Sequence, residues 1–190
     1  MTSIITSSHQ DKYNKYTEYP RASYNIIKYL IANNDLLFRL LKYPDAKAFR
    51  LDADHPNLTL EEKNSMLYNG IDPETDFNLF IDLRQDDAWT KQFSFIRIAP
   101  SKLVPTNYVY GYMPIVMIPY THFKINTMIN GETRLDRMTQ QLIETLNGAE
   151  IPDVGQLFFD ARASRECQMT LTGSIPYSGN VLVMCNHQLG

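Results

Sequence analysis

The chain has 190 residues, of which 44% are hydrophobic and 21% charged, and its formal net charge is -3. This length suits one domain with a sizeable core, and the composition is typical of a soluble globular protein. The acidic balance argues against a dedicated nucleic-acid binder, because neutralising phosphates requires a basic face. No apolar run approaches the ~20 residues that span a bilayer, so we expect no membrane segment.

The first 20 residues differ from the rest of the chain. They show no periodicity, end in Tyr19-Pro20 and contain no continuous apolar run of the kind found in a signal peptide. We expect residues 1–20 to form an extended N-terminal arm that is ordered only where a partner holds it. Residues 21–190 are expected to form a single domain made in a reducing cytoplasm.

Helical spacing begins at Ser23. The apolar residues that recur at this spacing are Ile26, Ile27, Leu30, Ile31, Leu36, Leu37, Leu40 and Leu41. Asn34 or Asp35 is expected to cap the second of two helices, and Pro44 to close it. Thr59 and Glu62 match a capping box, which predicts a third helix over 60–68.

Extended patterns follow these helices. Residues 77–83 and 93–98 are predicted strands, the first with alternating apolar positions that include Phe77 and Ile81. The polar stretch between them suits a hairpin loop. A third extended run covers 107–120, where two prolines at 114 and 119 favour an edge position or a bent strand.

The clearest pattern lies in residues 134–159. An apolar helical stripe is formed by Leu135, Met138, Leu142, Ile143 and Leu146, with Arg134 off the stripe. Asn147-Gly148 is a helix stop, and a strand follows at 155–159. Later runs at 167–173 and 180–186 are predicted strands, and Ser178-Gly179-Asn180 suggests a hairpin turn between them.

This order of elements predicts the fold class. Helices, strands, one long helix and further strands indicate an α+β domain with a mainly antiparallel sheet. The N-terminal helices and the long amphipathic helix are expected to pack on one face of that sheet.

No motif in the sequence marks an enzyme or a cofactor site. The histidines are scattered, and His122 could act as a base, although a solitary histidine near a strand end is more often structural. Neither cysteine has zinc-site spacing, and there is no glycine pattern for phosphate binding. We therefore expect no catalytic residue, cofactor or metal, and a small hydrolase without a recognisable motif is the least favoured alternative.

Tyrosine and arginine mark two candidate contact surfaces. The candidate residues are Tyr108, Tyr110, Tyr112, Arg162 and Arg165. Tyrosine combines apolar area with a polar tip, which suits partly wet protein–protein contacts, although tyrosine is also simply common on strands. The two arginines lie either in a solvated loop with local ion pairs or on a rim that contacts a partner subunit.

The sequence resembles a group of proteins from the neck of tailed bacteriophages, the head-to-tail connectors and tail terminators. The resemblance is carried by "NNDLLFRLLKYPDAKAFRLD...LTLEEKNSML" and, downstream, "GETRLDRMTQQLIETLNGAEIPDVGQLFF". The matching elements are an LLKY-like helix at Leu40 to Tyr43, a helix from Arg134 to Asn147, and a VG-x-L-x-F strand from Val154 to Phe158. The arm and the run from 101 to 122 lie outside the resemblance.

The resemblance implies a virion structural protein that assembles into a six-fold or twelve-fold ring at the head–tail junction. Its neighbours would be portal, neck and tail-tube proteins, and DNA would pass through the lumen without specific binding. A ring of identical subunits needs a heterologous interface that closes on itself, for which strand edges and arms are suited. A tail or baseplate component with the same subunit plan is the alternative.

Overall fold

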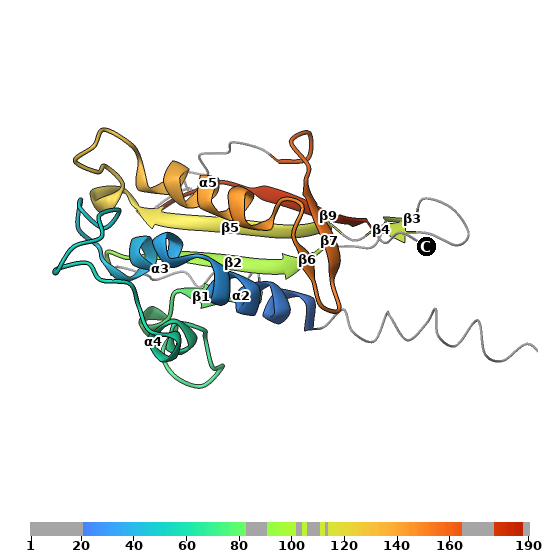
Figure 1. Cartoon of the computed structure of the whole chain (residues 1–190), viewed down its shortest axis with the longest axis horizontal. Helices are drawn as coiled ribbons and strands as arrows, with labels where there is room; N and C mark the ends of the chain where they lie inside the picture. Colours follow the sequence, from blue (N-terminus) through green and yellow to red (C-terminus); the bar gives the residue numbers. More distant parts are fainter. Residues whose placement is uncertain are drawn as a thin grey trace, which may run out of the picture.

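A mostly antiparallel sheet with helices over one face forms the centre of the molecule, which confirms the predicted α+β class (Figure 1). The computed structural model describes residues 21–82, 91–101, 104–105, 111–112, 114–164 and 177–187. The predicted strand at 167–173 lies outside these residues.

The strand order in the main sheet is β1-β2-β5-β9-β7-β6, with β8 also paired to β5. The strands are β1 (Leu79–Phe80), β2 (Ser94–Pro100), β5 (Pro114–His122), β6 (Glu150–Ile151), β7 (Gly155–Phe159), β8 (Tyr177–Gly179) and β9 (Leu182–His187). A separate ladder joins β3 (Val104–Pro105) to β4 (Gly111–Tyr112). β1 runs parallel to β2, so the predicted hairpin between them is wrong, since a hairpin joins antiparallel strands.

The predicted helices form, with one change of length. They are α2 (Ala22–Asn33), α3 (Asp35–Lys42), α4 (Leu60–Ser65) and α5 (Arg134–Leu146), with short 3-10 turns η2 (Glu74–Asp76) and η3 (Phe123–Ile125). Asn34 caps α3 by accepting a hydrogen bond from the Leu37 N–H at 2.7 Å, and Thr59 and Glu62 form the expected capping box. α4 ends at Ser65 because the Met66 carbonyl accepts the N–H groups of residues 78 and 79, which turns the chain toward β1.

Buried side chains lie on both faces of the sheet. The main core contains side chains of β2 and β5 together with those of α2, α3 and α5. A second, aromatic cluster consists of Phe77, Phe80, Phe93, Phe95, Tyr120 and Tyr177. Leu79 belongs to the main core and Phe80 to the aromatic cluster, so this short strand is buried on both sides. Ile81, predicted to point inward, is 51% exposed because the strand has already ended.

β5 is a central strand despite its two prolines, so the predicted edge position is wrong. Pro114 is the first residue of the strand, where proline is tolerated. Pro119 faces an interruption, because β9 pairs with β5 up to Met117 and β8 pairs with it from Tyr120. The Pro119 carbonyl accepts the Asn180 N–H at 3.3 Å on that side. Proline has no backbone N–H to donate, and Pro119 lies where the pairing of β5 with β8 and β9 is interrupted, so no hydrogen bond between strands is lost.

β8 and β9 follow one another along β5, so the predicted hairpin turn at 178–180 is wrong. Tyr120 pairs with Gly179 and Met117 pairs with Leu182, which is one continuous register. Gly179 is needed for close packing, because a Cβ atom there would lie 2.8 Å from the Tyr120 ring. The glycine makes room for the aromatic cluster and does not form a turn.

Candidate functional site

Among the predicted contact residues, Arg162 has a described side chain. It is exposed in the turn that follows β7. Tyr112 lies on β4, while Tyr108, Tyr110 and Arg165 lie outside the described residues. The contact role of all five residues stays a prediction.

A groove of about 480 Å³ lies beside the turn that carries Arg162, and we call it the α5 groove. One wall is a helical stripe of α5, made by Asp136, Thr139, Gln140, Ile143 and Glu144. The opposite wall comes from the end of β7, the following turn and the start of β9, through Phe159, Ala161, Ser164, Asn180, Val181 and Leu182. No pattern in the sequence marks this groove, although Arg162 beside it is one of the candidate contact residues.

Hydrogen bonds fix both walls of the α5 groove. The Asn180 side chain donates to Thr139 Oγ1 at 3.0 Å and so joins the strand wall to the helix. Ser164 Oγ accepts the Val183 N–H at 3.0 Å and donates to the Asp160 carbonyl at 2.6 Å, which fastens the turn to β9. The groove is therefore built before any ligand binds.

The chemistry of the α5 groove is mixed. Ile143 and Phe159 are partly buried against the main core, and Leu182 is buried, so the floor is apolar. Asp136 and Glu144 are exposed on the helix wall, and Arg162 stands beside the opposite wall. Such a surface fits a polypeptide segment that combines aromatic or aliphatic side chains with basic ones.

A second candidate region is the loop end, defined as residues 43–56 and 123–133, at the opposite end of the sheet from the short β3–β4 ladder (Figure 1). The two loops are joined by a hydrogen bond from the Ile129 N–H to the Ala46 carbonyl at 3.2 Å. Three large apolar side chains are exposed here, Leu51 at 65%, Phe123 at 58% and Ile129 at 52%. A braced loop pair that exposes apolar side chains is a candidate contact surface.

Arg134 fastens the loop end to the helices. Its side chain is fully buried, although it lies off the predicted apolar stripe. Nε donates to the Ile125 carbonyl at 3.0 Å, Nη1 donates to the Leu40 and Tyr43 carbonyls at 2.6 Å each, and Nη2 donates to the Asp45 carbonyl. Burial lowers the pKa of Arg134 to about 10, so the guanidinium remains charged near neutral pH.

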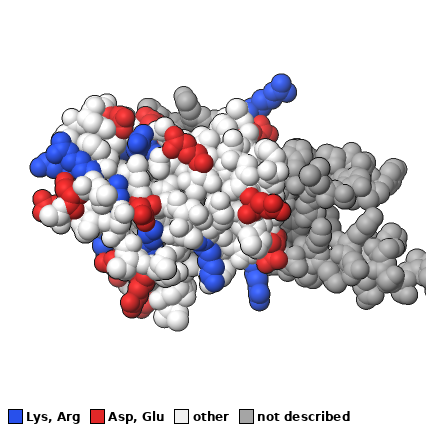
Figure 2. Space-filling view, in the orientation of Figure 1, with Lys and Arg blue, Asp and Glu red and all other residues white. Residues whose placement is uncertain are grey.

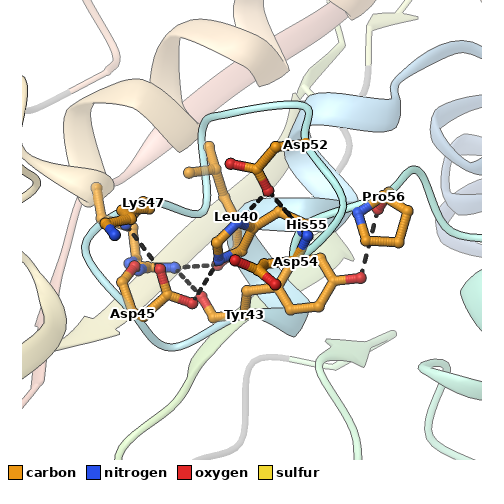
Figure 3. A network of polar contacts seen from close by, with 9 residues as sticks. Leu40, Tyr43, Asp45, Lys47, Asp52, Asp54, His55 and Pro56 are labelled. Carbon is orange, nitrogen blue, oxygen red and sulfur yellow. Dashed lines mark hydrogen bonds and ion pairs between the residues drawn. The ribbon is translucent and has the colours of Figure 1, made fainter.

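His55 closes the loop of residues 43–56 from inside. Its Nδ1 lies 2.8 Å from Asp52 Oδ1 and its Nε2 lies 2.8 Å from Asp45 Oδ2 (Figure 3). A neutral imidazole has one N–H, whereas two carboxylate acceptors call for two, so this geometry favours the imidazolium. The hydrogen bond to Asp45 is the main cause that raises the pKa of His55. Because both ring nitrogens contact a carboxylate, His55 joins Asp45 to Asp52 across the loop, an arrangement that we call the His55 clamp.

Other buried ionisable groups also form ion pairs or hydrogen bonds with residues of the same chain. Lys63 lies 2.6 Å from an Asp35 oxygen and ties α4 to α3, and Arg97 pairs with Asp82 at 2.5 Å. His122 is buried, and its Nδ1 accepts the Lys124 N–H at 3.1 Å, which is the structural role that its position suggested. Within the described part of the chain, no group of three or more His, Cys, Asp or Glu side chains could hold a metal ion.

Charges on the helix-covered face are mixed in sign. Figure 2 shows acidic and basic side chains interspersed there among uncharged surface. This pattern differs from the continuous basic stripe of a nucleic-acid-binding surface. No helix in the described ranges is both long and apolar enough to cross a membrane.

The fold and these surfaces define a small α+β protein with surfaces suited to protein contacts. The chain belongs to the YomW family, whose model matches residues 34–174. This family is phage-derived, of the SPBeta prophage type, so the chain is a phage-associated protein. Neither a curated protein nor a solved structure matches the chain.

Proposed function

We propose that this protein is a structural subunit of the bacteriophage virion neck. It forms a ring at the head–tail junction, as a tail terminator or head–tail connector, around the channel that DNA crosses. It acts by assembling with copies of itself and with portal, neck and tail-tube proteins, and it catalyses no reaction. Membership of a phage-derived family supports the phage part of this proposal.

The observation that carries the proposal is the physical link between the segments that resemble neck proteins. Arg134, the first residue of the helical segment, donates to the carbonyls of Leu40 and Tyr43, the two ends of the LLKY segment. Leu157 of the VG-x-L-x-F strand lies in the same main core as Leu146 of the helix. Segments that are far apart in the sequence therefore form one packing unit, as expected if they were retained together as a building block.

The surface of the subunit also suits assembly. A heterologous ring interface needs two different patches that fit one another on neighbouring copies. The α5 groove and the loop end share no residues. They supply two distinct candidate patches, one concave and one with exposed apolar side chains.

Labelling of virions tests the position in the particle. A gold-labelled antibody against this protein should bind at the head–tail junction in electron micrographs, and negatively stained purified protein should show rings. An antibody against the major head protein serves as the control for label specificity. Label on the baseplate or along the tail would favour the alternative tail role, and virions without label would contradict a virion role altogether.

A further inference from the structure

We propose that the α5 groove binds the N-terminal arm of a second copy of this chain, through residues 12–16. This inference rests on the proposed ring assembly and names the contact that builds it.

The sequence of the arm complements the groove. Residues 12–16 read Lys-Tyr-Asn-Lys-Tyr, two basic and two aromatic side chains in five positions. The floor of the groove is apolar at Ile143, Phe159 and Leu182, and its helix wall exposes Asp136 and Glu144. Tyrosine rings suit such a floor because they bury apolar area while the hydroxyl stays wet, and the lysines are attracted by the acidic wall.

The proposed ring favours a second copy over the same copy, because an arm held in the groove of its own chain would join no two subunits. The face of α5 toward α2 and α3 is occupied, since the Asn34 side chain donates to Thr145 Oγ1 at 2.6 Å and to the Gln141 carbonyl at 3.3 Å. The groove lies on a different stripe of α5, which starts at Asp136 and includes Ile143.

The linker between the proposed binding segment and α2 is short. Four residues, 17–20, separate the proposed binding segment from Arg21 at the start of α2. Fully extended, the five steps from residue 16 to Arg21 span about 18 Å at most. Binding in a neighbour needs only that its groove faces the start of α2, which is a heterologous arrangement that can close into a ring.

Charge reversal on each side of the contact tests the proposal in the full-length chain. The arm variant carries Lys12→Glu with Lys15→Glu, and the groove variant carries Asp136→Lys with Glu144→Lys. Each variant should weaken self-association by about tenfold or more, because reversal replaces attraction at the rim by repulsion. A chain that carries all four substitutions should assemble again. A control with Lys28→Glu and Glu61→Lys, at exposed positions on α2 and α4, should assemble like the wild type.

Mixing the two defective variants distinguishes an arm bound by a neighbouring copy from an arm bound by its own chain. Under the proposal, the normal arm of the groove variant fits the normal groove of the arm variant, and the reversed arm fits the reversed groove as in the chain with all four substitutions. An equal mixture should therefore form rings again, with the two variants alternating. An arm that binds the groove of its own chain would gain nothing from mixing. Circular dichroism spectra equal to that of the wild type confirm that the variants fold. Sedimentation velocity measures the size of the assemblies in each sample.

The possible outcomes test the arm contact and the proposed neck role separately. If both reversed variants still form rings as the wild type does, the arm contact is overturned and the proposed neck role stands. Rings disrupted as predicted, but located on the baseplate by antibody labelling, would retain the contact and overturn the neck role. A wild-type chain that stays monomeric with all neck neighbours present would overturn both.

Discussion

The loop end and the α5 groove use their charges in opposite ways. His55 in the loop end and Arg134 directly after it are buried, and their polar atoms bind carbonyls and carboxylates of the same chain. In the α5 groove Asp136 and Glu144 are exposed on the wall of an open cavity. Charges of the first kind hold the fold in place, whereas charges of the second kind remain accessible to another molecule. The difference predicts which substitutions alter stability and which alter association.

The largest effect is expected at Arg134. Arg134→Met should lower the free energy of unfolding by about 3–5 kcal/mol, because buried carbonyls at the ends of α3 and η3 would lose their donor. Urea denaturation followed by circular dichroism measures the change. Arg137→Met, one turn along and on a more exposed part of the same helix, is the matched control and should change the value by less than about 0.5 kcal/mol. Equal effects at both positions would contradict the role of Arg134.

A pH-dependent effect is expected at His55. Its pKa is raised in the folded protein, so its stabilising contribution is complete below the ordinary histidine pKa of 6.5 and is lost as pH rises through the folded pKa. Asp45 and Asp52 have lowered pKa values, so their contribution is complete above about 4 and is lost as pH falls further. The clamp should therefore be strongest between these limits. Other ionisable groups face this network from neighbouring elements. Tyr43 packs edge-on against His55, Arg134 lowers the pKa of Asp45, Arg39 interacts with Asp52, and Lys47 and Asp54 donate backbone N–H groups to Asp45 and Asp52.

Comparison with variants isolates the contribution of His55. The difference in unfolding free energy between wild type and His55→Asn should shrink as pH is raised from about 6 to about 9. His122 provides a contrast of opposite sign, because burial lowers its pKa and its protonation below pH 6.5 should destabilise the fold. A wild-type minus His55→Asn difference that stays constant with pH would contradict the charged clamp.

The smallest effect on stability is expected in the groove. Glu144→Lys should change the free energy of unfolding by less than about 0.5 kcal/mol, because the carboxylate is exposed and accepts hydrogen bonds from glutamine side chains on the same helix. Thermal unfolding at low and high salt measures this. A loss as large as that expected for Arg134→Met would show that the groove wall is structural, and would remove the distinction between the two regions.

Local patterns explain which parts of the fold could be predicted from the sequence. α2, α3 and α5 follow from apolar spacing and caps such as Asn34, which depend on neighbours within a few residues. The central position of β5 and the continuous line of β8 and β9 depend on partners far along the chain. Pro119 and Gly179 look like strand-breaking and turn residues, and only the distant pairing shows why each is tolerated.

The same distinction applies to the candidate site. The burial of Arg134 could not be predicted from neighbouring residues, because the carbonyls that bind it come mostly from more than 80 positions earlier. The signal available in the sequence was its position directly after the capping Thr133. For His55 the signal was the three-residue spacing from Asp52, but Asp45 completes the clamp from outside that spacing.

The molar mass of the wild-type chain in solution tests the central claim most directly. Light scattering across a range of concentrations, alone and with the neighbouring neck proteins, should give a closed multiple of the 22.0 kDa subunit, with six or twelve copies expected. A mass that stays at one subunit under every condition would contradict the account of this protein as a self-assembling part of the virion.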